Sequence, residues 1–274
     1  MSDISVRFWG VRGTIPCPGP ETLRYGGNTT CIELTCGEHQ LIFDAGSGIR
    51  RLGRIASGNG RRDYDIFLTH THLDHIIGLP FFGPAFNPEV TMRVHAGHLD
   101  HSSKLRDVIA NMMQDPLLPI SVDTFQADTE FKRFEQGDTL TPFQGINMQT
   151  APLNHPNGCT GYRIEFKDKA VAIVTDTEHK PGETDEHVMG LAKDADIMIY
   201  DATYTDDEYT SKVGWGHSTW QEAIRVGTAA NVGKVVIFHH DPERTDEQMD
   251  EIASAAEAMR PGTIAAREGM VLYI

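Results

Sequence analysis

The sequence predicts a layered α/β fold, and three observations support this prediction. Short apolar runs rich in Val, Ile and aromatic residues alternate with stretches of helical periodicity along the whole chain. Polar residues follow several of these runs where a strand would end. The 274 residues can bury a substantial core, as one large α/β domain or two small ones. Because no linker, charge block or repeat divides the chain, we expect a single domain spanning 1–274.

Ten apolar segments are predicted to be strands. They lie at 5–10, 31–36, 40–46, 65–70, 90–96, 162–166, 170–176, 196–202, 234–240 and 269–274. Five polar signatures fall at strand ends, namely "FDAG", "LTHTHLDH", "VTD", "YDAT" and "FHHD". Because sites in layered α/β folds collect at the carboxyl ends of strands, we expect these segments to contribute to one site.

Four segments with helical periodicity are predicted to be helices, at 102–113, 185–194, 218–233 and 245–259. Ser218 with Gln221, and Thr245 with Gln248, have the spacing of capping boxes, so they are expected to start the third and fourth helices. Gly233 is expected to end the third helix.

Composition narrows the class of protein. The formal net charge is −15 and no basic run is present, which disfavours a long nucleic acid as partner but leaves a small anionic substrate open. No apolar run approaches the roughly 20 residues needed to cross a bilayer. The N-terminus lacks the pattern of a secretory signal, and the four cysteines form no C-x-x-C pair. We therefore expect a cytoplasmic protein with reduced thiols and no membrane contact.

The stretch "HTHLDH" at 70–75 places three histidines and an aspartate within six positions. His70 and His72 can point to one side as the chain leaves the sheet, whereas Asp74 and His75 fall on the next turn. Neutral imidazole suits Zn, Fe, Co or Mn, and carboxylate oxygen suits the harder ions of that set. The loop therefore offers ligands to two metal ions, as in two-metal sites that hold their ions roughly 3.5–4 Å apart.

The missing ligands should come from other strand ends, and candidates exist. The candidates are His155 in "LNHPNG", Asp176 in "VTDTEH", and either His239 or His240 in "VVIFHHDP". A lone H-x-H is more often a solvated turn, but here D-H and three further strand-end ligands accompany it. We therefore favour a metal site.

Several other polar residues are expected to lie outside the metal site. Arg12 and Arg24 could meet a phosphate, but surface arginines are the safer interpretation. His179, close to Asp176 in the sequence, is expected at the rim of a pocket. Three further histidines are spaced by three residues: His95, His98 and His101. They could line a helix face as an extra metal site, but we favour solvated or packing roles for them.

The motif "HTHLDH" resembles the H-x-H-x-D-H signature of the metallo-β-lactamase fold superfamily, and "LIFDAGSG" at 41–48 resembles the strand and turn before it. This resemblance implies a four-layer αββα sandwich with mixed sheets, in which Asp44 supports the metal loop. It also implies a ligand set: His70, His72 and His155 for the first ion, Asp74, His75 and His239 for the second, and Asp176 between them. By the same resemblance, His239 is preferred to His240, because its position after "VVIF" matches the ligand that follows the late strand in relatives.

A second resemblance narrows the branch. "YDAT" and "GHST" are similar to the "HEAT" and "GHST" elements of the phosphodiesterase branch, which includes tRNase Z and small cyclic phosphodiesterases. It implies that His217 is a general acid oriented by Asp201, although tRNase Z has the longer glutamate at that place. Asp74 would steer the attacking water.

These residues together predict a binuclear metal-dependent phosphodiesterase that cleaves a small phosphodiester, such as a cyclic nucleotide, by metal-bound hydroxide. Two divalent ions are expected, with zinc favoured and manganese or iron as alternatives. The alternative function is a lactonase or thioesterase acting on a carbonyl substrate at the same metals, without need of the Asp201–His217 pair. A di-iron redox protein ranks lower, because no flavodoxin-like domain follows. Dimerisation is common among relatives, which leaves a homodimer open.

Overall fold

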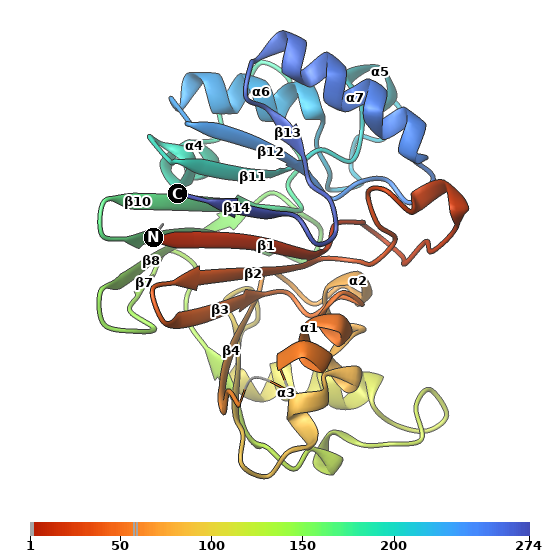
Figure 1. The fold of residues 1–274 in the computed structure, drawn as a ribbon, viewed down its shortest axis with the longest axis vertical. Helices are drawn as coiled ribbons and strands as arrows, with labels where there is room; N and C mark the ends of the chain where they lie inside the picture. The colour runs from red at the N-terminus through yellow and green to blue at the C-terminus, as the bar shows by residue number, and fades with distance from the viewer. Residues whose placement is uncertain (1–2, 57, 59) are drawn as a thin grey trace.

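Two mixed β-sheets pack face to face, and helices cover their outer faces (Figure 1). The structure is a computed structural model that describes residues 3–56, 58 and 60–274. The first sheet runs in the order β14 (Val271–Tyr273), β1 (Ile4–Gly10), β2 (Cys31–Cys36), β3 (His39–Phe43), β4 (Asp63–Leu68), β5 (Thr91–Ala96) and β6 (Asp128–Arg133). The second runs β13 (Ile264–Ala265), β12 (Lys234–Phe238), β11 (Ile197–Asp201), β10 (Lys169–Val174), β9 (Cys159–Phe166), β8 (Ile146–Leu153) and β7 (Thr139–Leu140).

The helices are divided between the two sheets. Those that follow strands of the first sheet are α1 (Ile49–Ala56), α2 (Leu73–Ile76) and α3 (Ser102–Met112). The others are α4 (Glu186–Ala192), α5 (Asp206–Tyr209), α6 (Trp220–Ala229) and α7 (Asp246–Met259). Four short 3₁₀ turns among the described residues lie at Pro20–Thr22, Leu79–Phe81, Gly83–Phe86 and Val122–Thr124. In Figure 1 the layers are stacked as helices, sheet, sheet and helices, which confirms the predicted four-layer sandwich.

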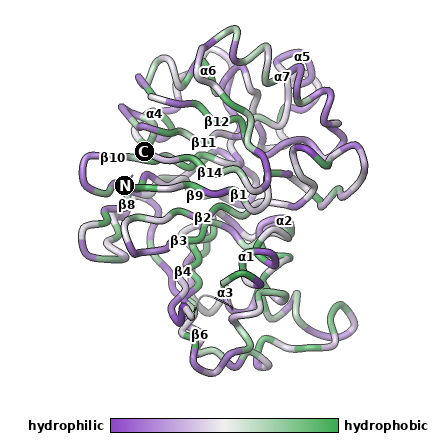
Figure 2. Tube along the Cα trace, viewed as in Figure 1, coloured by the Kyte–Doolittle hydropathy of each residue, from purple (hydrophilic) through white to green (hydrophobic). Residues whose placement is uncertain are grey.

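Period-two alternation along the buried strands builds the layers. In β4, Phe67 points into the core between the sheets, whereas Ile66 and Leu68 pack in the core beneath α1 and α3. In β11, Ile199 likewise faces the other sheet and Met198 faces α4 and α6. Figure 2 shows the hydrophobic segments running along the central strands. Strands that are buried on both faces appear in the sequence as continuous apolar runs, and for this reason they can be predicted from it.

The parallel parts of both sheets bring strand ends together. The neighbours β3, β4 and β5 are parallel, as are β10, β11 and β12. Their carboxyl ends therefore lie along one edge of each sheet. Among the described residues, no helix combines the length and apolar character that crossing a membrane would require.

The structure corrects two predicted helix boundaries. The N-cap of α6 is Thr219, whose hydroxyl accepts a hydrogen bond from the Glu222 N–H, so the predicted cap at Ser218 is one residue early. Ala230 is the C-cap, so Gly233 does not end this helix and instead precedes β12. The capping box of Thr245 and Gln248 is confirmed at the start of α7.

Candidate metal centre

The candidate site forms where strands from both sheets end. His70 follows β4, His155 follows β8, Asp176 follows β10 and His239 follows β12. Three residues at these ends have a left-handed backbone: Asp44 with φ 61°, Asp176 with φ 57° and His239 with φ 60°. This conformation is uncommon outside glycine, and where surrounding structure enforces it the residue is often functional. The strand ends thus turn these side chains toward a shared point.

The structure brings His70, His72 and His155 into one group, with one ring nitrogen of each within 4.8 Å of the others. The His155 Nε2 lies 3.1 Å from the His72 Nδ1. Nitrogens that bind one tetrahedral zinc ion at about 2.0–2.1 Å lie roughly 3.3 Å apart, so this spacing suits a shared cation. The three side chains are those predicted for the first ion.

A second group consists of Asp74, His75, Asp176 and His239, all buried. The His75 Nε2 lies 3.4 Å from the Asp74 Oδ2 and 3.3 Å from the Asp176 Oδ2. The His239 Nε2 lies 3.4 Å from the Asp74 Oδ2 and 3.2 Å from the Asp176 Oδ1. The Asp176 Oδ1 is also 3.9 Å from the His70 Nε2 of the first group. Asp176 therefore lies between the two groups.

Hydrogen bonds at the back of each ring fix its orientation. The His75 Nδ1 lies 2.8 Å from the Asp44 Oδ2, and the other Asp44 oxygen accepts from the Thr69 N–H at 2.8 Å. The His155 Nδ1 lies 2.7 Å from the Gly216 carbonyl oxygen, and the His239 Nδ1 lies 3.1 Å from the Thr203 hydroxyl. Such outer contacts set the tautomer and aim of metal-ligating histidines.

The inward-facing atoms fit divalent cations. The Nε2 atoms of His70, His75 and His239 are buried without a hydrogen-bond partner, a state that is costly unless something else binds them. Burial alone would raise the pKa of Asp74, but His75 and His239 outweigh it and hold this pKa well below its usual range. Burial would also lower the pKa of His75, but Asp176, Asp74 and Asp44 raise it. Imidazole nitrogens alternating with ionised carboxylates are a donor set for zinc, manganese or iron.

The predicted pair of Asp201 and His217 is in contact. The Asp201 Oδ2 lies 2.9 Å from the His217 Nδ1, so the shorter aspartate reaches the ring. Thr203 and the Thr177 N–H hold the same carboxylate. Burial would lower the pKa of His217, but the carboxylates of Asp201 and Asp176 outweigh it and raise this pKa to about 9. The ring is stacked on that of His239 at 4.9 Å between centroids, so it lies at the edge of the second group.

His240, the open alternative to His239, lies outside both groups. Its Nε2 is 2.9 Å from the Ala266 carbonyl oxygen, and burial lowers its pKa to about 3. Arg12 departs from its expectation as a surface arginine because it is fully buried. Arg24 is exposed and pairs with Asp250, as a surface arginine would.

The structure also places the three spaced histidines. His95 lies on β5 rather than on a helix and packs flat against Phe67, with ring centroids 4.3 Å apart. His98 follows that strand, and its Nε2 lies 3.1 Å from the Thr71 hydroxyl inside the "HTHLDH" loop. The third, His101, is the N-cap residue of α3. His98 therefore supports the loop at 70–75, a role that the sequence did not predict.

Main-chain contacts to the site were missed as well. The Thr14 N–H donates to the Asp74 Oδ2 at 2.7 Å, and the Gly216 carbonyl faces His155. Every residue has the same main-chain groups, so no sequence motif could have predicted these two contacts. Thr203 could have been found, because it stands in "YDAT" two residues after Asp201.

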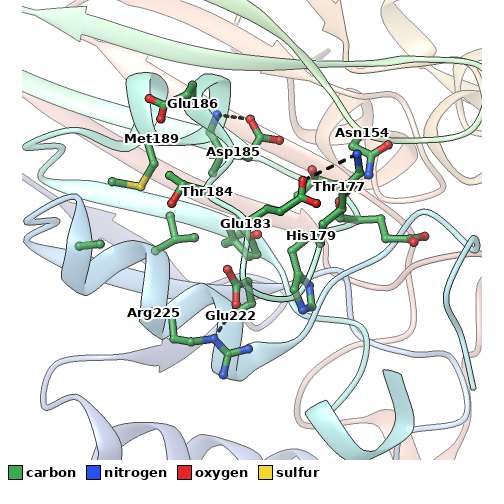
Figure 3. A pocket seen from close by; sticks show the side chains of 16 residues that line it. Asn154, Thr177, His179, Glu183, Thr184, Asp185, Glu186, Met189, Glu222 and Arg225 are labelled. Atoms are coloured by element: carbon green, nitrogen blue, oxygen red, sulfur yellow. Dashed lines mark hydrogen bonds and ion pairs between the residues drawn. The ribbon is translucent and has the colours of Figure 1, made fainter. Parts of the chain in front are cut away.

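A cavity of about 520 Å³ lies beside the centre, between α4, α6 and the segment 177–186 (Figure 3). His179, expected at a pocket rim, lines it together with Asn154 and Thr177, which neighbour His155 and Asp176 in the chain. Its lining includes five carboxylate side chains and two cationic ones, Lys180 and Arg225. None of the residues that line it is a proposed metal ligand, so this cavity is separate from the candidate metal centre.

The fold and the paired groups define a metal-dependent hydrolase. The chain belongs to the beta-lactamase superfamily, because residues 39–240 match the family described as "Beta-lactamase superfamily domain". Ribonuclease Z of Archaeoglobus fulgidus is 24% identical over 314 aligned positions, covering 98% of this chain and 97% of that protein.

Two solved structures show the same fold. The metallo-beta-lactamase fold protein YhfI from Bacillus subtilis superposes with a TM-score of 0.76 at 18% identity, covering 99% of each chain. A diphosphatase from the PhnP family superposes with a TM-score of 0.71 at 17% identity, covering 99% of this chain and 98% of that one. The family match confirms the superfamily that the motifs resemble, and the two superpositions show its fold.

Proposed function

We propose that this protein is a two-metal phosphodiesterase that cleaves a small phosphodiester, such as a cyclic nucleotide. The observation that carries the proposal is the contact of 2.9 Å between Asp201 and His217 at the edge of the clustered ligands. A thioester hydrolase expels a thiolate, which leaves without a proton, so it has no need of a charged histidine beside the metals. A phosphodiesterase of this kind expels an alkoxide, which a histidine held by a buried carboxylate can protonate.

In the proposed site, each group has one role. His70, His72 and His155 would hold the first ion, Asp74, His75 and His239 the second, and Asp176 would bridge them. When bound, the two ions would activate a water molecule and neutralise the phosphoryl oxygens. Asp74 would orient the attacking water through its carboxylate. His217, kept protonated by Asp201, would give its proton to the leaving oxygen.

Charge supports a small substrate. The chain carries 39 acidic against 24 basic side chains, so a long polyanion would be repelled away from the metals. A single phosphodiester requires only the local positive field of the bound ions. The relatives fit phosphorus chemistry by name, since one is called a ribonuclease and one a diphosphatase. The ribonuclease name favours RNA as the competing substrate, and the assay must include it.

The test is hydrolysis by the zinc- or manganese-loaded protein of cyclic nucleotides, bis-p-nitrophenyl phosphate, a precursor tRNA and a panel of lactones. We expect turnover of the first two. His217→Ala should lower cyclic nucleotide turnover by about 10²–10⁴-fold, the usual contribution of a general acid. The loss should be smaller for bis-p-nitrophenyl phosphate, because p-nitrophenolate leaves without a proton. Metal content should stay at two equivalents.

His187→Ala is the matched control, since His187 is an exposed histidine on α4, away from both groups. It should behave as the unmodified protein. If His217→Ala lowered turnover of cyclic nucleotides and of bis-p-nitrophenyl phosphate by the same factor, His217 would not be the proton donor. Preference for lactones would favour the carbonyl hydrolase, and preference for precursor tRNA would overturn the small-substrate proposal.

A further inference from the structure

Arg12 is a buried charge that the proposed chemistry does not use. Its side chain is fully buried, and no described carboxylate lies within ion-pair distance of it. Instead, its Nε donates to the Gly26 carbonyl at 2.8 Å, and its Nη1 donates to the carbonyls of Asp241 at 3.0 Å and Arg244 at 2.7 Å. A guanidinium is expensive to bury, so its retention here calls for a role beyond packing.

The guanidinium ties the N-terminal loop to the chain that follows His239. The Gly13 N–H donates to the His240 carbonyl at 3.0 Å, and the His240 N–H donates to the Val11 carbonyl at 2.9 Å. Together with the bonds from Arg12 to Asp241 and Arg244, these contacts make residues 11–14 and 240–244 one unit.

This unit touches two of the proposed ligands directly. The Thr14 N–H donates to the Asp74 Oδ2 at 2.7 Å, and Thr14 holds a left-handed backbone with φ 65° to do so. Gly13 lies against the His239 ring so closely that an added Cβ would come within 2.2 Å of its Cε1. The same Asp74 oxygen lies 3.4 Å from the Nε2 atoms of both His75 and His239.

We propose that residues 12–14 form a positioning loop for the second metal ion, clamped by Arg12 and acting through Asp74 and His239. This inference rests on the proposed two-metal site and deepens it. Among the described residues, the hydrogen-bond partners of His70, His72 and His155 do not include this loop. Its effect is therefore confined to the second ion, whereas a merely structural arginine would affect both ions or neither.

The experiment is a titration of the metal-free protein with Zn²⁺ and, separately, Co²⁺, followed by calorimetry and by the visible Co²⁺ spectrum. Two variants are compared with the unmodified protein. Arg12→Met removes the clamp, and Gly13→Ala pushes a methyl group against His239 while leaving the guanidinium bonds in place. Arg24→Met is the matched control, because Arg24 is a neighbouring arginine whose partners Asp250 and Glu247 lie on α7.

We expect two equivalents for the unmodified protein and for Arg24→Met. In both loop variants the first equivalent should bind as before, and the second should bind about 10–100-fold more weakly, the usual effect of losing an outer-shell support. Should Arg12→Met fail to fold, Gly13→Ala decides alone. Unchanged affinities, or equal weakening of both equivalents, would overturn the positioning loop. An unmodified protein that binds neither metal would instead overturn the proposed function.

Discussion

At the scale of single residues, the candidate centre depends on close approaches that leave no room for a side chain. Gly216 shows this most clearly. Its carbonyl accepts from the His155 Nδ1 at 2.7 Å, its backbone has φ 86°, and an added Cβ would lie 2.4 Å from that same nitrogen. Only glycine can hold this loop so near to the ring without displacing it.

Gly216→Ala should therefore displace His155 and weaken the first metal ion, the opposite pattern to the loop variants at residues 12 and 13. Gly214→Ala is a matched control, because Gly214 has nearly the same backbone, φ 87°, but an added Cβ meets nothing within 4 Å. Both variants pay the same cost of roughly 1 kcal/mol for alanine in a left-handed conformation. Metal titration distinguishes them: equal affinities in the two variants would contradict the assigned approach to His155.

This residue scale also shows what the sequence could predict. The proposed ligands were identifiable because imidazole and carboxylate groups are rare in such density after apolar runs. His70, His155, Asp176 and His239 come from four different strand ends, yet each carries its own local signal. The Thr14 N–H and the Gly216 carbonyl carry none, because every residue has a main chain. The prediction that Arg12 lies at the surface was wrong for a related reason. An arginine without an acidic partner nearby in the sequence normally lies at the surface.

At the scale of elements, the strands that are apolar on both faces were the ones that the sequence predicted, whereas the amphipathic β8 ("INMQTAPL") was not expected. The central strands β10, β11 and β12 are apolar on both faces and were all expected. β6 ("DTEFKR") was not expected, because it is a largely exposed edge strand with charged residues, as edge strands often are. β7 and β13 have two residues each, too few to form a pattern.

The pair β4–β5 provides an element-scale test through Asp65. Its carboxylate accepts from the Arg93 Nε and Nη2 at 2.8 Å each and lies 3.0 Å from the His95 Nε2. Burial would raise the pKa of Asp65, but these bonds outweigh it and lower the pKa to about 2. A carboxyl with a depressed folded pKa stabilises the fold above its unfolded pKa, and this contribution is lost as the pH falls from about 4 through 2.

Asp65→Asn should therefore cost up to about 2.6 kcal/mol in the free energy of unfolding at neutral pH and almost nothing near pH 2. Urea unfolding at several pH values measures this difference. Asp63→Asn is the control, because Asp63 approaches Arg93 only at 3.4 Å and its side chain is 63% exposed. A penalty for Asp65→Asn that does not change with pH would contradict the ionic origin of the stabilisation.

At the scale of the whole molecule, the two sheets contribute to the centre separately. The loop 70–75 belongs to the first sheet, whereas His155, Asp176 and His239 follow strands of the second. The apolar core between the sheets includes Phe67 and Phe238, each only a few residues from a proposed ligand. Ions bound at this seam would join the two sheets at one edge, in addition to the packing that joins their faces.

Metal removal should consequently destabilise the whole molecule. A ligand present at about 1,000 times its dissociation constant stabilises the native state by about 4 kcal/mol, provided that it does not bind the unfolded chain. Adding a chelator should lower the melting temperature by several degrees, and excess Zn²⁺ should restore it.

Asp176→Asn removes the carboxylate that lies between both groups, with little change in volume, so the melting temperature of this variant should respond much less to the chelator. Calorimetry with and without chelator compares the two proteins. Because the seam joins both sheets, a single transition should shift as a unit; separate melting of one sheet would contradict a shared metal centre.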